Sequence, residues 1–207
     1  MKNLQVFLKS KGYEIDVDGV IGKNTLSALK EYISAVFLNK KYVHMNKGLV
    51  YIRTDEKLTN SYDDFVVLFV GGEIVKVVPC STTAGKYYVQ NPISYGGVTG
   101  TAIAVEQQVV GSHKYVYKKD WSTLWLKMPY FQQVRPIDIF RDGNKDAILD
   151  RRAPKQFGLF GINLHRGGLG GLIDKWSAGC QVTPDVHWKE IIKYFSEGEI
   201  INFNLIN

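Results

Sequence analysis

Residues 65–78 read FVVLFVGGEIVKVV, and this stretch decides the fold class. Two arms rich in Val, Ile, Leu and Phe flank Gly71-Gly72, and a glycine pair is typical of the two-residue turn that joins hairpin strands. We therefore predict a β-hairpin here. Similar runs predict further strands on both sides of it, at residues 49–53, 100–105, 115–117, 157–164 and 200–205.

The first 42 residues have a different periodicity and predict two short helices. Apolar residues recur at helical spacing in residues 4–8, and Gly12 suits the left-handed residue that ends a helix. A second helix is expected to start at an Asn24 or Thr25 cap. It would bury one apolar stripe, formed by Leu26, Leu29, Ile33 and Val36 or Phe37.

These two patterns divide the chain. We predict a small helical module at residues 1–42, a polar linker at 43–48 and a mainly β domain at 49–207, which the 207 residues can accommodate. One further short helix is expected from Asp185 to Phe195, with Pro184 near its start.

Composition limits the partners. The formal net charge is +6, which suits a polyanion such as the bacterial cell wall. The lysines are scattered and no arginine-rich run occurs, so nucleic acid is not the expected partner. No apolar stretch reaches membrane-spanning length, and we expect no membrane insertion. The start, MKNLQVFLK, lacks the features of a signal peptide, so synthesis in the reducing cytoplasm with free thiols is expected.

The segment from Asn163 to Val182 carries the candidate chemistry. It contains His165 and then Ser177-Ala178-Gly179-Cys180. A cysteine nucleophile needs a base to take its proton and fixed donors where negative charge develops. We predict Cys180 as the nucleophile and His165 as its base, delivered by the end of the predicted strand 157–164.

The neighbouring residues are candidates for supporting roles. Ser177 could orient His165, and the backbone N–H groups of Gly179 and Cys180 could hold an oxyanion. Arg166 could meet a substrate carboxylate with two hydrogen bonds. Trp176, as a pocket wall or as part of the core, and Gln181 complete the substrate-binding candidates.

The other cysteine and histidines have weaker claims. Cys80 ends an apolar strand and is predicted to be a buried structural thiol. His44 lies in the linker, His113 in an expected loop and His187 on an expected surface helix.

Two loops carry the acidic residues that a cation site needs. Asp16 and Asp18 are interpreted as loop-forming residues that make Asx turns. Residues 142–146 have Asp-x-Asn-x-Asp spacing, which is the first half of a calcium loop, but Ala stands at the sixth and twelfth positions, where Gly and Glu are required. This pattern favours a polar turn, and we expect neither metal nor cofactor.

The His165 and Ser177-x-Gly179-Cys180 pattern resembles the L,D-transpeptidase catalytic domain, a family of cysteine enzymes that act on peptidoglycan stem peptides. Residues 81–85 resemble the Ser-Thr-x-x-Gly segment of that family. Ala178 and Val182 depart from it, at positions that help handle the substrate carboxylate and the acyl acceptor, and the variant resembles phage-encoded lysins. Residues 4–29 resemble a small peptidoglycan-binding module. The resemblance implies a β-sandwich with short helices.

Three functions follow from this resemblance. The first is an endolysin-type peptidase that cleaves an L,D peptide bond in wall stem peptides through a Cys180 acyl-enzyme, with the protein reaching the wall of a phage host after release from the cytoplasm. The second is a transpeptidase that forms or exchanges cross-links. The third is a non-catalytic wall-binding protein.

Overall fold

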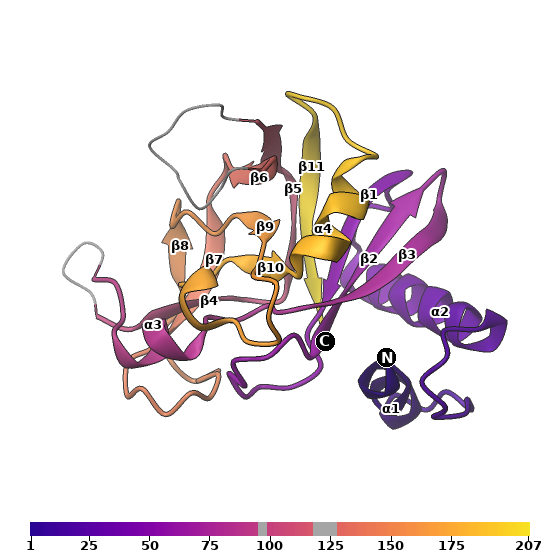
Figure 1. Cartoon of the computed structure of the whole chain (residues 1–207), viewed down its shortest axis with the longest axis horizontal. Helices are drawn as coiled ribbons and strands as arrows, with labels where there is room; N and C mark the ends of the chain where they lie inside the picture. Colours follow the sequence, from indigo (N-terminus) through magenta and orange to yellow (C-terminus); the bar gives the residue numbers. More distant parts are fainter. Residues whose placement is uncertain (95–98, 118–127) are drawn as a thin grey trace.

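The computed structural model describes residues 1–94, 99–117 and 128–207. The chain forms a large mixed sheet, a smaller sheet and a few helices (Figure 1). The helices are α1 (Lys2–Ser10), α2 (Lys23–Lys40), α3 (Lys86–Gln90), the 3-10 turn η2 (Asp174–Trp176) and α4 (Asp185–Ile192). Within the described residues, none of them has both the length and the apolar content needed to cross a bilayer.

Eight strands form the large sheet, in the order β10-β9-β6-β5-β11-β1-β2-β3. Their bounds are β10 (Gln181–Thr183), β9 (Leu164–Arg166), β6 (Tyr130–Gln133), β5 (Gln107–Val116), β11 (Ile200–Ile206), β1 (Lys47–Ile52), β2 (Asp64–Val70) and β3 (Glu73–Cys80). The pairs β1–β11 and β9–β10 are parallel and the others are antiparallel.

The two ends of this sheet meet. Ser81, which follows β3, bridges Val182 of β10 through two backbone hydrogen bonds of 2.8 and 2.9 Å. The sheet is therefore curved, and β10 has a neighbour on each side. Three strands, β4 (Thr101–Ala104), β7 (Ile137–Asp142) and β8 (Gln156–Gly158), form the second sheet, which lies at the opposite end of the molecule from α1 and α2 (Figure 1).

Both faces of the large sheet are buried at β1 and β2, which explains the uninterrupted apolar sequence of β2. Side chains alternate along a strand. Val66 and Leu68 enter the inner core shared with α4 and the second sheet. Val67 and Phe69 enter a second core beneath α1 and α2. The N-terminal helices thus cover a sheet face that would otherwise expose apolar side chains to water.

The loop between α1 and α2 is held by one side chain. The amide of Gln5, which is 1 % exposed, donates to Asp18 Oδ1 at 2.7 Å and to the carbonyl of Val20 at 3.0 Å, and it accepts the N–H of Gly19. Asp18 Oδ1 also accepts the N–H of Val20 at 2.8 Å, which confirms its predicted role in an Asx turn.

The mainly β character and the 65–78 hairpin are confirmed, with the turn glycines at φ 65° and 77°. The predicted strand at 157–164 is wrong. Residues 156–158 form β8 of the small sheet, residues 164–166 form β9 of the large one, and the chain crosses between them through Gly161 at φ 70°. The predicted cap of α2 is also wrong, since the helix begins at Lys23 after Gly22.

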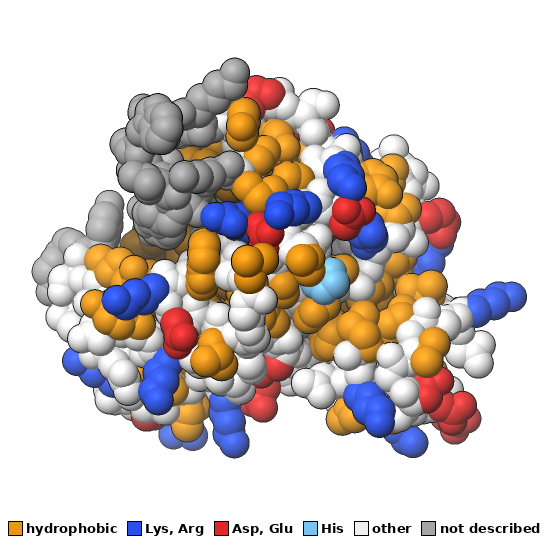
Figure 2. Space-filling model, viewed as in Figure 1, with side chains coloured by type: hydrophobic (Ala, Val, Ile, Leu, Met, Phe, Trp, Pro, Cys, Tyr) orange, Lys and Arg blue, Asp and Glu red, His pale blue; other side chains and the backbone are white. Residues whose placement is uncertain are grey.

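The charged side chains are distributed over the surface. Figure 2 shows lysine and arginine side chains spread across the viewed face, with acidic side chains among them. The positive net charge therefore forms a diffuse field on this face.

The shared core generates a prediction about folding. Leu29 is fully buried against the sheet, whereas Leu38 on the same helix is 78 % exposed. Leu29→Ala is expected to lower the free energy of unfolding by about 2–5 kcal/mol, and Leu38→Ala by little. All four tryptophans lie in the sequence beyond residue 120, so urea unfolding followed by tryptophan fluorescence reports on the β part. If Leu29→Ala and the native protein have the same urea midpoint in the fluorescence transition, the helices fold separately from the β part.

Candidate active site

Two adjacent parallel strands position the cysteine and the histidine. His165 is the middle residue of β9, and its partner in β10 is Val182. Cys180 directly precedes β10. Since β10 is bound to β9 on one side and to Ser81 on the other, the backbone that carries Cys180 is held from two directions.

Cys180 and His165 line the same cavity, which has a volume of about 290 Å³. Its wall also includes Asn163, Ala178, Trp176 and Arg141. The Cys180 thiol is half-buried, donates to the carbonyl of Gly161 at 3.3 Å and accepts the N–H of Asn163 at 3.4 Å. Among the described contacts, the sulfur makes no hydrogen bond to His165, an arrangement that free enzymes often show before substrate tightens the site.

The hydrogen bond of His165 fixes its tautomer. Nδ1 lies 2.7 Å from the carbonyl oxygen of Arg166. A carbonyl can only accept, so Nδ1 carries the proton and the neutral ring keeps a lone pair on Nε2. Burial, as the main cause, lowers the pKa of His165 to about 4. The imidazole is therefore neutral at pH 7, and Nε2 can accept a proton.

Burial has the opposite effect on the thiol, because it disfavours the charged form of each group. It raises the pKa of Cys180 from 9.0 to about 11, and the hydrogen bond from Asn163 N–H offsets only part of this increase. The free protein therefore holds a neutral thiol beside a neutral imidazole, not a thiolate–imidazolium pair.

Ser177 shapes the turn before Cys180. Its Oγ donates to the carbonyl of Cys180 at 2.8 Å and accepts the N–H of Gly179 at 3.1 Å, while its own carbonyl accepts the N–H of Gly85. The contact to the His165 ring that we expected from Ser177 is made by the carbonyl of Arg166.

Gly179 is required by close packing. It has φ 139°, and a Cβ there would lie 2.5 Å from the carbonyl oxygen of Ala102. Its N–H is engaged by Ser177 Oγ and is not available to an oxyanion. The N–H of Cys180 has no acceptor on another described residue, so it is the better placed of the two expected donors.

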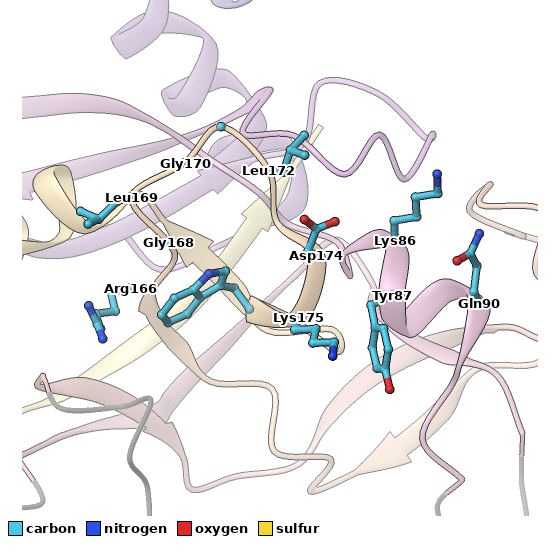
Figure 3. A pocket seen from close by; sticks show the side chains of 12 residues that line it. Lys86, Tyr87, Gln90, Arg166, Gly168, Leu169, Gly170, Leu172, Asp174 and Lys175 are labelled. Carbon is cyan, nitrogen blue, oxygen red and sulfur yellow. The ribbon is translucent and has the colours of Figure 1, made fainter.

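Arg166 and Trp176 border a second, larger cavity of about 990 Å³ beside the first. Arg166 forms an ion pair with Asp185 at 3.0 Å, and its guanidinium lies 5.1 Å from the Trp176 ring centroid. In Figure 3, Lys175 and Tyr87 lie side by side, with Lys86 and Gln90 on α3 beyond them. Trp176 and Lys175 line both cavities and form the wall between them.

Gln181 is placed differently from the other binding candidates. Its side chain is fully buried, its Nε2 donates to the carbonyl of Gly179 at 3.4 Å, and it lines neither cavity. It therefore contacts the turn below Cys180 and not the space where a substrate would lie.

Sequence reasoning missed Arg141 as a lining residue. It lies on β7, a strand that was not predicted, although residues 137–140 alternate Ile-Asp-Ile-Phe. Its guanidinium donates to Gln156 and to the carbonyl of Gly100. It gives the cysteine cavity a fixed positive charge.

Cys80 and His113 are both fully buried. Cys80 is fully buried, as predicted, and burial raises the pKa of its thiol well above the ordinary value. His113 is not in a loop: it is buried on β5, stacks on Phe203, and binds the carbonyl of Ile162 at 2.8 Å. It thus supports the chain that leads from Gly161 to β9.

The buried histidines predict a loss of stability in acid. Burial lowers the pKa of both His113 and His165 from 6.5 to about 4. Below pH 6.5 the unfolded chain takes up protons that the folded chain does not. Each histidine therefore lowers the free energy of unfolding by about 3 kcal/mol as the pH falls towards 4. In urea titrations at pH 7 and pH 4, His113→Gln should reduce this loss by about that amount. Equal losses in the native protein and in His113→Gln would contradict the shift of His113.

No family model matches the chain, and no curated protein matches it significantly. One similar solved structure is an L,D-transpeptidase from Stackebrandtia nassauensis, with 15% identity, a TM-score of 0.38, and coverage of 100% of this chain and 90% of that one. Another is the L,D-transpeptidase (residues 123–326) from Xylanimonas cellulosilytica DSM 15894, with 15% identity, a TM-score of 0.33, and coverage of 99% and 91%. At these TM-scores, the function has to be argued from the residues of this chain.

Proposed function

We propose that this protein is a cysteine peptidase that cleaves an L,D peptide bond in peptidoglycan stem peptides. The observation that carries the proposal is that Cys180 and His165 line one cavity, with the imidazole held so that Nε2 is free of its proton. The class of substrate comes from the resemblance of the residues around His165 and Cys180 to the L,D-transpeptidase pattern.

The neutral resting pair defines the first step. As the Cys180 sulfur attacks the carbonyl carbon of the substrate, its proton passes to Nε2 of His165, and the carbonyl π electrons move to the oxygen. The N–H of Cys180 donates to that oxyanion. The carbon–nitrogen bond then breaks, the amine leaves with the proton from His165, and a thioester remains on Cys180.

The second step releases the acid. Water attacks the thioester, His165 accepts its proton, and the thiol is restored. An amine in place of water would give a new cross-link. We favour water because Ala178 and Val182 replace the residues that, in the resembling family, handle the substrate carboxylate and the acyl acceptor.

The charges around the two cavities fit an acidic peptide. Arg141 lines the cysteine cavity, and Lys175 stands on the wall between the cavities. Lys86 adds a positive charge to the larger cavity and Asp174 a negative one. We place the scissile bond in the smaller cavity with a stem carboxylate facing Arg141, and we place a longer part of the peptide in the larger one.

In this proposal residues 1–42 bind the polymer. Because α1 and α2 share a core with β1 and β2, they would present a fixed face to the wall instead of moving on a tether. The bound wall would then have a fixed orientation relative to Cys180. Binding would also raise the local substrate concentration.

The experiment is a digest of intact peptidoglycan sacculi, with soluble fragments identified by mass spectrometry. Cys180→Ala is expected to abolish peptide release while wall binding persists, because the nucleophile is gone and the helices are untouched. The matched control is Cys80→Ala, which removes the buried thiol outside the cavity and should retain release.

Three outcomes would overturn the proposal. Release that persists in Cys180→Ala would exclude the cysteine mechanism. Exchanged D-residues or new cross-links without net release would identify a transpeptidase. An unchanged wall would identify a binding protein.

A further inference from the structure

The loop after β7 places a buried carboxylate next to two further oxygen-bearing side chains. Asp142 is the last residue of β7 and is 1 % exposed, although it begins an exposed polar loop that contains Asn144 and Asp146. These three residues have the spacing of the first, third and fifth ligands of a calcium loop.

One oxygen of the Asp142 carboxylate is unaccounted for. Oδ2 accepts the N–H of Ala147 at 3.2 Å, and the backbone N–H groups of Lys145 and Asp146 also interact with the carboxylate, so it is turned into the loop. Oδ1 is buried and has no hydrogen-bond partner among the described residues. A buried carboxylate oxygen without a donor is costly, and a bound cation is one way to satisfy it.

The loop also lacks a compensating charge. Within residues 1–94, 99–117 and 128–207, neither Asp142 nor Asp146 forms an ion pair with a lysine or arginine. Lys145 lies between them in sequence, but its Nζ reaches away to the carbonyl of Gln90 at 3.4 Å. Within the described residues, therefore, no lysine or arginine pairs with either carboxylate of this loop.

The backbone makes the turn at the sixth position of the loop although glycine is missing there. The sixth position of a calcium loop requires a sharp turn and usually takes glycine. Here it is Ala147, which adopts φ 61°. Alanine is strained in this region, but the turn is made all the same.

We propose that residues 142–148 bind a calcium ion, with Asp142 Oδ1, Asn144 Oδ1, a carboxylate oxygen of Asp146 and the carbonyl oxygen of Ile148 as its protein ligands. No three His, Cys, Asp or Glu side chains gather as a metal site in the described residues. A calcium loop differs because amide and backbone oxygens supply part of the shell. The twelfth position is Ala153 and adds no carboxylate, so a weak dissociation constant of roughly 10⁻⁴ to 10⁻³ M is expected.

The ion would fix this loop to a neighbouring segment. Ala147 and Leu149 pair with residues 56–58 through backbone hydrogen bonds of 2.8 and 2.9 Å. Arg151 then forms ion pairs with Glu56 and Glu106. Calcium would thus stabilise the surface next to β7, the strand that carries Arg141 into the cysteine cavity.

The test compares melting temperatures of EDTA-treated protein in 10 mM CaCl₂ and in 10 mM MgCl₂, with calcium titrations followed by calorimetry. Calcium, but not magnesium, should raise the melting temperature of the native chain by roughly 3–10 °C, with one saturable site. Asp146→Asn changes an exposed ligand and should weaken binding on the order of tenfold. The matched control, Asp16→Asn, alters an exposed aspartate in the other acidic loop and should keep the native response.

Several results would overturn the site. These are an equal effect of both ions, a calcium response that Asp146→Asn retains in full, and an absence of saturable heat. Because none of these readouts involves peptidoglycan, failure of the calcium site and failure of the proposed peptidase are distinguishable.

Discussion

The meeting of the two ends of the eight-stranded sheet is the constraint on which the site depends. The backbone hydrogen bonds between Ser81 and Val182 hold β10 on one side, and β9 holds it on the other. Cys180 directly precedes β10 and His165 lies within β9, so the sheet fixes both backbones. Gly179 then packs so closely on Ala102 that no side chain fits between them. The candidate reactive groups are therefore positioned by main-chain contacts, to which the Ser177 hydroxyl adds hydrogen bonds with Gly179 and Cys180.

The second constraint is the burial of both faces of the large sheet at β1 and β2. One face of β1 and β2 belongs to the core beneath the cavity, and the other is covered by α1 and α2. The stability of the site and the position of the N-terminal helices are thus coupled, because the same single sheet layer lies between the two cores. If the helices bind the wall, as proposed, their orientation relative to Cys180 is set by this packing.

Local sequence signals predicted much of the fold but less of the site. The glycine turn of the hairpin and the buried Cys80 follow from short patterns, and they are confirmed. The split of residues 157–164 between two sheets could not be predicted, because it depends on pairing with distant strands. Arg141 was missed because its place in the cavity depends on how β7 packs, although residues 137–140 carry a local strand signal. The direction of the Cys180 and His165 pKa shifts depends on burial, which a sequence pattern does not report.

The central claim is that Cys180 rests as a neutral thiol that only a bound substrate activates through His165. Alkylation by iodoacetamide as a function of pH tests it most directly, in a Cys80→Ala background where Cys180 is the only thiol. With a pKa of about 11, the rate should rise about tenfold per pH unit from pH 6 to 9, without a plateau. A rate that is already constant near pH 7 would show a preformed thiolate–imidazolium pair and contradict the account.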